Sequence, residues 1–493
     1  MDAFPLYDSA FEHEACGVGF IAARDLKASF RLTRLAVECL VRLDHRGARA
    51  ADGTGDGAGI LTELPHRIIE RDLASKGISH PGRDKVGVIM AFLPNDGTDE
   101  ARSLIESSLT HEQIPVLTWR KVPIDPGVLS QRANETLPTI EQVIVSAPDG
   151  IDAEAFERRL FLARKHMERA GDQLDLFSIP SASARTVVYK GLFRAADISN
   201  FYWDLSDPDY ETSFAIFHQR YSTNTFPAWP SAQPFRAIAH NGEINTVRSN
   251  RSWMQSRHRY VESPIWGERA RDLLPCLPDG LAASGSLDTG FELLLRTGRS
   301  LAHVKEMLIP AAWENVADQD PQLRSFYEYH AFLTEPWDGP AAIAATDGIS
   351  LLAGMDRNGL RPARWAISPD VVLVSSEAGV CPEEEAQAVK TGQLGPGEIL
   401  LFDRTDGAIR FSDDLKAALA AMQPYGDWID TETDYVQKPF DGEVDDRFDP
   451  EALCRVFGYT AEERRMILAE MAEGKTPVGS MGSDTQLAAL DER

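Results

Sequence analysis

The sequence has few cysteines and no long apolar run, and each shortage excludes a class of protein. Its 493 residues include only five cysteines, which are scattered and form no CxxC pair. This usage argues against a disulfide framework or a zinc site. The chain has no apolar run long enough to cross a bilayer, and its first residues, MDAFPLYDSAFEHEA, lack the basic and apolar segments of a signal peptide. We therefore expect no membrane segment, no metal site and a reducing, cytoplasmic setting.

Positive charge is also scarce. The sequence has 50 Lys and Arg residues and 76 Asp and Glu residues, so the formal net charge is −26. Such a balance repels nucleic-acid backbones and anionic membranes, and we expect neither as a partner. With 43% hydrophobic and 26% charged residues, the composition is that of a folded globular chain. At ~100–200 residues per domain, this length suggests two to four domains.

Apolar runs typical of strands recur along the chain and often follow one another without an intervening helix. The runs are CGVGFIAA from Cys16, VGVIMAFL from Val86, QVIVSA from Gln142, TVVYKGLF from Thr186, FAIFHQ from Phe214, FRAIAH from Phe235, and AAIAAT, ISLLAG, VVLVSS and EILLF between Ala341 and Phe402. Helical spacing occurs between Asp152 and Ala170, with Gly171 as a C-cap, and again from Phe291 to Met307. The pattern predicts an α+β fold with mostly antiparallel strands.

An acidic, polar stretch from Gly426 to Asp449 predicts a surface connector and a domain boundary near residue 430. Beyond it, Thr460 and Glu463 form a capping box that opens one short helix. One helix and a polar tail are too little to bury a core. We therefore expect residues 431–493 to be a connector followed by the truncated start of another domain.

Cys16 is the first residue that could carry chemistry, because it follows a leader without structural pattern and opens a predicted strand. If the preceding bond were cut, its thiol would stand beside its own free α-amine, and nucleophile and base would share one residue. Taken alone, a cysteine opening a strand is equally typical of a buried core residue.

Two further segments could hold a ligand. The glycine-rich stretch from Asp44 to Ile60 allows close backbone approach, although it lacks the Lys of a phosphate-binding loop and also fits a tight structural loop. In HQRYSTNTFPAWPSAQPFRAIAHNGEIN, the guanidinium of Arg220 suits a carboxylate, and Asn241 with Gly242 suits an oxyanion. A surface ion pair and an ordinary Asn-Gly turn are the alternatives for these residues.

Eight blocks, in order, resemble one family. The blocks are HEACGVGFIA, LDHRGA, TGDGAGIL, HQRYSTNTFPAWP, AHNGEINT, YEYHAFLTEPWDGPAA, DRNGLRPARW and PVGSMGSDT. Together they are similar to the amidotransferase portion of the glutamate synthase large subunit, over nearly the whole chain. The resemblance implies a four-layer αββα sandwich of antiparallel sheets, the N-terminal nucleophile hydrolase fold. It also implies a leader at residues 1–15 that is removed, and an amidotransferase domain at residues 16–430.

The resemblance further implies the role of each site residue in glutamine hydrolysis. The thiol of Cys16 would form a γ-glutamyl thioester, Asn241 and Gly242 would hold the oxyanion, and Arg46 would lie near the nucleophile. Arg220 would hold the substrate carboxylate, with Thr223 of the same block also in the substrate site. The ammonia would serve glutamate synthesis from 2-oxoglutarate on a separate or missing synthase part. FMN and an iron–sulfur cluster are expected only there, with no cofactor in this chain.

One departure from the family pattern puts substrate binding in question. Where the family has Ser-Asp-Ser, this chain reads LAASGSLDTGFELL, so Ala283 occupies the position of the Asp that would pair with the substrate ammonium. Asp288 is the nearest carboxylate in sequence and matches a second, structural Asp of the pattern. Two alternatives therefore stay open: a catalytically degenerate relative that acts as a binding or regulatory subunit, and an amidohydrolase that uses another amide.

Overall fold

The computed structural model describes residues 16–50, 52–220, 228–433 and 449–475. Internal contacts divide the chain after Thr431 into a large unit and a small one. Within the described ranges, no helix combines the length and the apolar character needed to cross a membrane.

Strands of the large unit form three sheets in which all neighbouring strands are antiparallel. The first sheet has seven strands, in the order β14 (Lys390–Gln393), β12 (Arg364–Ile367), β13 (Val371–Ser375), β1 (Gly17–Ala23), β8 (Phe214–Gln219), β2 (Ala58–Glu63) and β7 (Thr186–Gly191). The second sheet has five, in the order β16 (Ala408–Phe411), β15 (Ile399–Asp403), β11 (Leu351–Met355), β10 (Ala341–Thr346) and β9 (Ile238–Gly242). The third has four, in the order β4 (Val116–Lys121), β5 (Thr139–Ser146), β3 (Val86–Leu93) and β6 (Ser178–Ser183).

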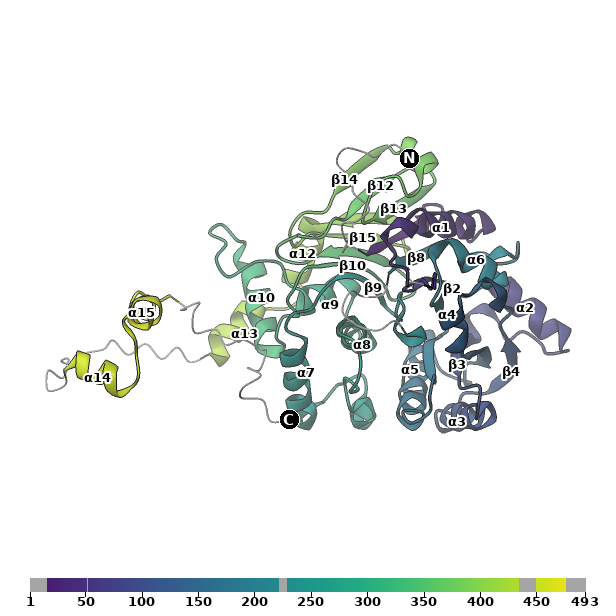
Figure 1. The fold of residues 1–493 in the computed structure, drawn as a ribbon, viewed down its shortest axis with the longest axis horizontal. Helices are drawn as coiled ribbons and strands as arrows, with labels where there is room; N and C mark the ends of the chain where they lie inside the picture. Colours follow the sequence, from purple (N-terminus) through teal and green to yellow (C-terminus); the bar gives the residue numbers. More distant parts are fainter. Residues whose placement is uncertain (1–15, 51, 221–227, 434–448, 476–493) are drawn as a thin grey trace. The chain divides into compact units, whose positions relative to one another are not determined.

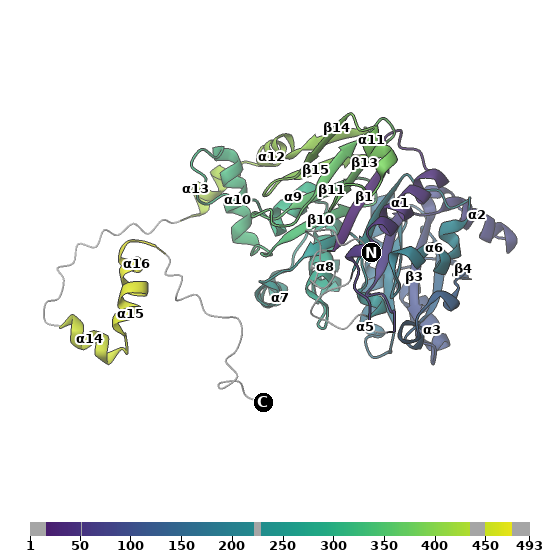
Figure 2. The same cartoon turned by 45° about the horizontal axis from the view of Figure 1, so that its top comes forward.

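The seven- and five-stranded sheets pack face to face and carry helices on their outer sides. Their shared core includes Phe20, Ile216 and Leu61 from one sheet and Ala344 and Leu400 from the other. Behind the first sheet lies α1 (Phe30–Arg42), and behind the second lie α8 (Ala283–Arg296) and α9 (Leu301–Leu308). Figure 2 shows α9, β10, β1 and α1 in this order from left to right, and Figure 1 gives the same layers from another side. The predicted α+β four-layer sandwich of antiparallel sheets is confirmed.

The four-stranded sheet is an addition to this sandwich. One of its faces packs on the core around α1, and the other is covered by α3 (Thr98–His111) and α5 (Ala153–Ala170). Gly171 caps α5 as the sequence predicts. The remaining helices of the large unit are α2 (His66–Ser75), α4 (Gln131–Glu135), α6 (Ile198–Phe201), α7 (Val247–Ser256), α10 (Pro321–Leu333), α11 (Pro382–Ala386), α12 (Ser412–Ala420) and α13 (Tyr425–Glu432).

Some predicted elements differ in extent from those observed. The helical region predicted from Phe291 to Met307 is two helices, because α8 ends before Gly298, which adopts a positive φ of 85°. The strand predicted from Phe235 begins only at Ile238, after a turn in which the N–H of Phe235 donates to the carbonyl of Ile238. The glycine-rich stretch ends in β2, where a side chain at Gly59 would lie 2.6 Å from the carbonyl oxygen of Gln233.

The small unit contains α14 (Pro450–Val456), α15 (Ala461–Glu463) and α16 (Ala469–Ala472). Its predicted capping box is present: the Thr460 hydroxyl accepts from the N–H of Glu463, and the Glu463 carboxylate accepts from the N–H of Thr460. Exposed apolar side chains such as Val456 and Phe457 remain on these helices. None of the described residues 449–475 is buried, so these helices form no core among themselves.

A buried ion pair ties the four-stranded sheet to the sandwich, and it supplies a first prediction. Arg120 of β4 donates to both carboxylate oxygens of Asp204 at 2.6 and 2.8 Å, and the hydroxyl of Tyr189 in β7 donates to the same carboxylate. Replacing Arg120 with Met would leave this carboxylate buried without its cation. We expect Arg120→Met to lower the free energy of unfolding by about 3–5 kcal/mol, measured by urea denaturation.

Lys121→Met is the matched control, because Lys121 follows Arg120 on the same strand and is exposed. It should change stability by no more than about 0.5 kcal/mol. Equal stability of the two variants would contradict a structural role for the pair.

Candidate functional site

Cys16 and Arg220 lie opposite each other at the ends of two neighbouring central strands of the seven-stranded sheet. Cys16 directly precedes β1 and Arg220 directly follows β8, and these strands pair with Gly17 opposite Gln219. Cys16, one residue before Gly17, therefore lies opposite Arg220, one residue after Gln219. The sequence predicted both residues from separate motifs, and the strand register brings them together.

The loop that carries Arg46 packs against the same ends of β1 and β8. A side chain at Gly17 would lie 2.7 Å from Cβ of Leu43, and one at Gly47 would lie 2.2 Å from Nε2 of Gln219. Only glycine permits this close approach at both positions. Arg46 itself pairs with Glu377 at 2.5 Å. The expectation that Arg46 lies near Cys16 stays a prediction. The charge of Arg46 is paired with the carboxylate of Glu377.

Arg220 is held in a strained conformation. Its φ of 89° lies in the left-handed region, which costs a residue with a side chain of order 1–3 kcal/mol. Its N–H donates to the carbonyl of Gly57 at 2.9 Å, and its Nε lies 3.7 Å from a carboxylate oxygen of Asp56. Strain that persists beside a candidate nucleophile is typical of functional sites. Thr223 lies outside the described residues.

Asn241 and Gly242 end β9 on the facing sheet. Asn241 is fully buried, and neither its amide nitrogen nor its carbonyl oxygen has a hydrogen-bond partner among the described residues. Leaving a buried amide without a partner costs about 1–3 kcal/mol. Gly242 has a φ of 145°, and a side chain there would lie 1.7 Å from the carbonyl oxygen of Pro340, so no other residue fits. A ligand could supply the missing hydrogen bond, and the role of the pair in holding an oxyanion stays a prediction.

A hydrogen bond between the two sheets sets the position of Asn241. The ring Nε2 of His218 in β8 donates to the carbonyl of His240 in β9, at 3.2 Å. The side chain of Gln233 accepts from the N–H of His240 at 2.8 Å and donates to the same carbonyl. His218 is two residues before Arg220, and His240 directly precedes Asn241. The ends of β8 and β9 that carry Arg220 and Asn241 are thereby fixed to each other.

The two histidines are neutral. Burial lowers the pKa of His218 to about 3 and that of His240 to about 4, with the charge of Arg361 adding to the effect on His240. Both are therefore weak proton acceptors near neutral pH. Neither is suited to deprotonate the thiol of Cys16.

Burial also dominates the acidity of Cys16. Although the residue keeps some exposed surface, desolvation raises the pKa of its thiol to about 11, and the charge of Asp56 adds to this, while Arg220 and Arg361 act in the opposite direction. The thiolate is scarce at neutral pH, so the nucleophile needs a base or a neighbouring cation to become reactive.

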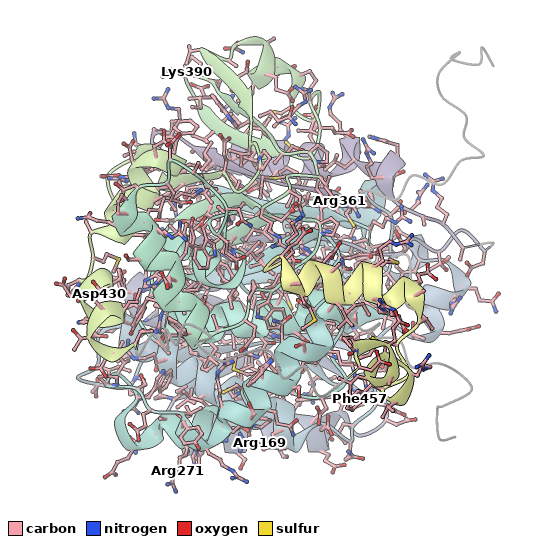
Figure 3. All side chains as sticks on the ribbon, turned by 90° about the vertical axis from the view of Figure 1, so that its left-hand side faces the viewer. Arg169, Arg271, Arg361, Lys390, Asp430 and Phe457 are labelled. Carbon is pink, nitrogen blue, oxygen red and sulfur yellow. The ribbon has the colours of Figure 1, made fainter. Side chains whose placement is uncertain are left out.

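Arg361 is the residue that sequence reasoning missed. It lies in the block DRNGLRPARW, in the loop after β11, and its side chain is labelled in Figure 3. Asp356 holds this loop beside the end of β9, because its carboxylate accepts from the N–H of Ala341, the strand partner of Gly242. Arg361 makes no hydrogen bond or ion pair with any described residue, and its Nε is buried. The block contains three arginines, and nothing in the sequence distinguishes this one.

Asp288 and Ala283 both belong to α8 but differ in their surroundings. The carboxylate of Asp288 is fully buried and accepts from the N–H groups of Ala237 and Ile238, and it lies 3.4 Å from Arg236. Burial raises its pKa. Ala283 opens the helix and packs on the apolar core beneath β9. Asp288 therefore anchors α8 to β9, while its role as a substrate ligand stays a prediction.

One group among the described residues has a spacing that could hold a metal ion. The ligand atoms of His111, Glu112 and His166 lie within 4.8 Å of one another. The Glu112 carboxylate is already bound by both terminal nitrogens of Arg269, at 2.6 and 2.9 Å. A guanidinium in that position repels a second cation, so the arrangement serves as an ion-pair cluster.

Comparison with known families assigns most of the chain. Residues 16–428 match the model of class-II glutamine amidotransferases, and residues 452–493 match the glutamate synthase central domain. The large chain of NADPH glutamate synthase from Azospirillum brasilense is 42% identical over 99% of this chain and 33% of its own length. Its counterpart from Bacillus subtilis is 38% identical over 99% and 32%. The chain thus spans about a third of the relatives that it matches.

More distant similarity is found to a solved structure. The glutamine phosphoribosylpyrophosphate amidotransferase from B. subtilis, complexed with ADP and GMP, matches with a TM-score of 0.29 and 13% identity, over 66% of this chain and 48% of that one.

The cation at Arg361 gives a prediction for the acidity of the candidate nucleophile. Because its positive charge favours the thiolate of Cys16, Arg361→Gln should raise the pKa of that thiol further. We expect slower alkylation of Cys16 by iodoacetamide at a fixed pH between 8 and 10, and a pH profile displaced upward. Peptide mass spectrometry separates Cys16 from the other cysteines.

Arg357→Gln is the control, since Arg357 is an exposed arginine of the same loop that pairs with Asp338. Identical alkylation profiles for the native chain and Arg361→Gln would show that Arg361 does not act on Cys16.

Proposed function

The chain belongs to the class II glutamine amidotransferases, and we propose that it hydrolyses glutamine at Cys16 as the ammonia-producing part of a glutamate synthase. The observation that carries this proposal is the fully buried amide of Asn241, which has no hydrogen-bond partner among the residues that the structure describes. A buried amide without a hydrogen-bond partner lowers the stability of the fold unless a ligand supplies the missing hydrogen bond. The oxyanion of an acyl-transfer intermediate is such a ligand.

We propose that removal of residues 1–15 supplies the base. With the thiol pKa raised to about 11 and both nearby histidines neutral, the proton of Cys16 needs another acceptor. A free α-amine, with a reference pKa of about 8, is deprotonated often enough near neutral pH to take it. The same amine, once protonated, can return that proton to the departing ammonia.

The reaction then has two stages. The thiolate attacks the carboxamide carbon, and the resulting oxyanion is held by the side chain of Asn241 and the N–H of Gly242. Collapse expels ammonia and leaves a γ-glutamyl thioester on Cys16. Water, deprotonated by the α-amine, attacks this thioester, and glutamate leaves as the thiol is restored.

Substrate recognition would rest on Arg220, with Thr223 in the same block. The guanidinium of Arg220 suits the α-carboxylate of glutamine. The ammonium lacks the partner that the family pattern provides, because Ala283 stands at that position. Since Asp288 is occupied by two backbone N–H groups and Arg236, it is poorly placed to substitute.

Ammonia would pass to a synthase part of the kind found in the longer relatives, and we propose that FMN and an iron–sulfur cluster reside there. The described residues do not fit such a cluster, since no three cysteines come together among them. The match of residues 452–493 to the central domain supports the link to a synthase. The five free cysteines support a reducing, cytoplasmic setting.

The amide of Asn241 provides the sharpest test. The purified chain should begin at Cys16 by intact mass and release ammonia from glutamine. Asn241→Ala should lower kcat by ~10²–10³, the usual loss for one oxyanion donor. Cys16→Ala serves as the inactive reference, and circular dichroism checks that both variants fold. Turnover in Asn241→Ala equal to that of the native chain would refute the assignment of the oxyanion site.

Ala283 distinguishes an active enzyme from a degenerate relative. A missing ammonium partner weakens binding in ground and transition states alike, so it raises KM with little effect on kcat. Ala283→Asp should then lower KM for glutamine about tenfold, equivalent to ~1.4 kcal/mol. Ala282→Asp, one residue earlier, is the matched control for added charge. If neither the native chain nor Ala283→Asp releases ammonia, the chain is a binding or regulatory subunit.

A further inference from the structure

The strand that carries Gly242 lies at the edge of its sheet. β9 is the last strand of the five-stranded sheet and pairs with β10 on one side (Figure 1). Antiparallel pairing alternates, so every second residue of β9 directs its N–H and carbonyl away from β10. Ala341 of β10 lies opposite Gly242, but its N–H and its carbonyl both bond to Asp356 on the other side. The N–H of Gly242 therefore points to the free edge of the sheet.

Side chains cap the outward-facing groups of β9 that come before Gly242. The N–H of Ile238 donates to the carboxylate of Asp288 at 3.1 Å. The N–H of His240 donates to the side-chain oxygen of Gln233 at 2.8 Å, and the carbonyl of His240 accepts from the side-chain nitrogen of Gln233 at 3.3 Å. The next outward donor is the N–H of Gly242, and no described residue accepts a hydrogen bond from it.

The side chain of Gln233 takes the place of a neighbouring strand. A carboxamide presents a donor and an acceptor side by side, as a backbone residue does, so it can form both hydrogen bonds of a strand pair with His240. An edge strand lacks one of its two rows of backbone hydrogen bonds, and its end is otherwise held from one side alone. The pair between Gln233 and His240 supplies the second side, two residues before Gly242.

Gln233 is itself held against the seven-stranded sheet. It is 3% exposed, and its carbonyl oxygen lies against β2, where a side chain at Gly59 would come within 2.6 Å of it. Gly59 is the strand partner of His218 in β8, and the ring of His218 donates to the carbonyl of His240. These four residues form a closed ring of contacts across both sheets. Gln233 thereby ties β9 to the sheet that carries Cys16 and Arg220.

We propose that Gln233 is a positioning residue, which aims the N–H of Gly242 at the oxyanion formed during glutamine hydrolysis. This inference rests on the proposed function. Both polar atoms of the Gln233 side chain are engaged by His240, so Gln233 acts through β9 and does not touch the substrate. An oxyanion donor works only when it is already in place, at about 2.7–3.1 Å from the developing charge. Gln233 therefore stabilises the transition state and contributes little to binding of glutamine in the ground state.

The first experiment compares Gln233→Met with the native chain. Methionine keeps the length of the side chain but makes neither hydrogen bond. We expect kcat for ammonia release from glutamine to fall about 10–100-fold, with KM unchanged within about twofold. Alkylation of Cys16 by iodoacetamide should keep its rate, because this substitution at carbon forms no oxyanion. Gln255→Met, at an exposed glutamine of α7, is the matched control and should leave all three quantities unchanged.

Gln233→Glu adds a pH signature that loss of packing would not produce. A protonated carboxyl group has one donor and one acceptor and can pair with His240 as the carboxamide does, whereas the ionised group has no donor and repels the carbonyl. Burial raises the pKa of a carboxyl group, so the protonated form becomes common as the pH falls toward neutrality and below. The ratio of kcat for Gln233→Glu to kcat for the native chain should therefore rise as the pH falls from 8.5 to 6.0.

Hydrogen exchange tests the same role without turnover. Gln233→Met frees the N–H of His240, so a peptide that contains β9 should exchange faster by mass spectrometry, while β10 keeps its rate. Circular dichroism checks the fold, and Gln233→Glu keeps the test open if Gln233→Met does not fold.

The proposal is overturned if kcat of Gln233→Met stays within about twofold of the native value, or if KM and the alkylation rate of Cys16 change as much as kcat. It is also overturned if exchange in β9 is unchanged. A native chain that releases no ammonia refutes the proposed function instead, and the exchange result then decides whether Gln233 sets the position of β9.

Discussion

The hydrogen bond from His218 to the carbonyl of His240 is the link on which the site depends. Each residue belongs to a different sheet, and each stands within two positions of a candidate site residue, Arg220 or Asn241. A two-sheet sandwich can slide or twist without losing much apolar contact, because dispersion forces are not directional. A buried hydrogen bond is directional, so it fixes the relative position of the strand ends. The low pKa of His218 keeps the ring neutral over the physiological range of pH, so no unpaired charge is buried at this link.

The layered core was predictable because its strands repeat a simple apolar pattern. The runs that begin at Cys16, Val86, Phe214 and Ala341 all form strands. Sequence reasoning missed β4, β6, β14 and β16, which are polar or short and lie at sheet edges, and it also missed β2 and β12, which lie inside the seven-stranded sheet. Polar or short strands carry little apolar periodicity in their sequences. These strands form because they pair with a neighbouring strand, and their own β-propensity contributes little.

The site residues also divide into those that a sequence motif reveals and those that only the folded structure reveals. Cys16, Arg220 and Asn241 stand in distinctive motifs, whereas Arg361 stands in an ordinary one. What makes Arg361 unusual is that it has no hydrogen bond or ion pair with any described residue, and that is a property of three-dimensional packing. Asp288 shows the opposite case: as the nearest acid to Ala283 it was a candidate ligand, yet its oxygen bonds to the backbone at the start of β9.

Anchoring by Asp288 has an evolutionary consequence. Because this carboxylate attaches α8 to the sheet, the first residue of the helix carries no part of the folding free energy beyond a small apolar contact. Selection for stability therefore acts on position 288 and hardly on position 283. A lineage can therefore exchange the residue at position 283 through neutral drift while the scaffold stays intact.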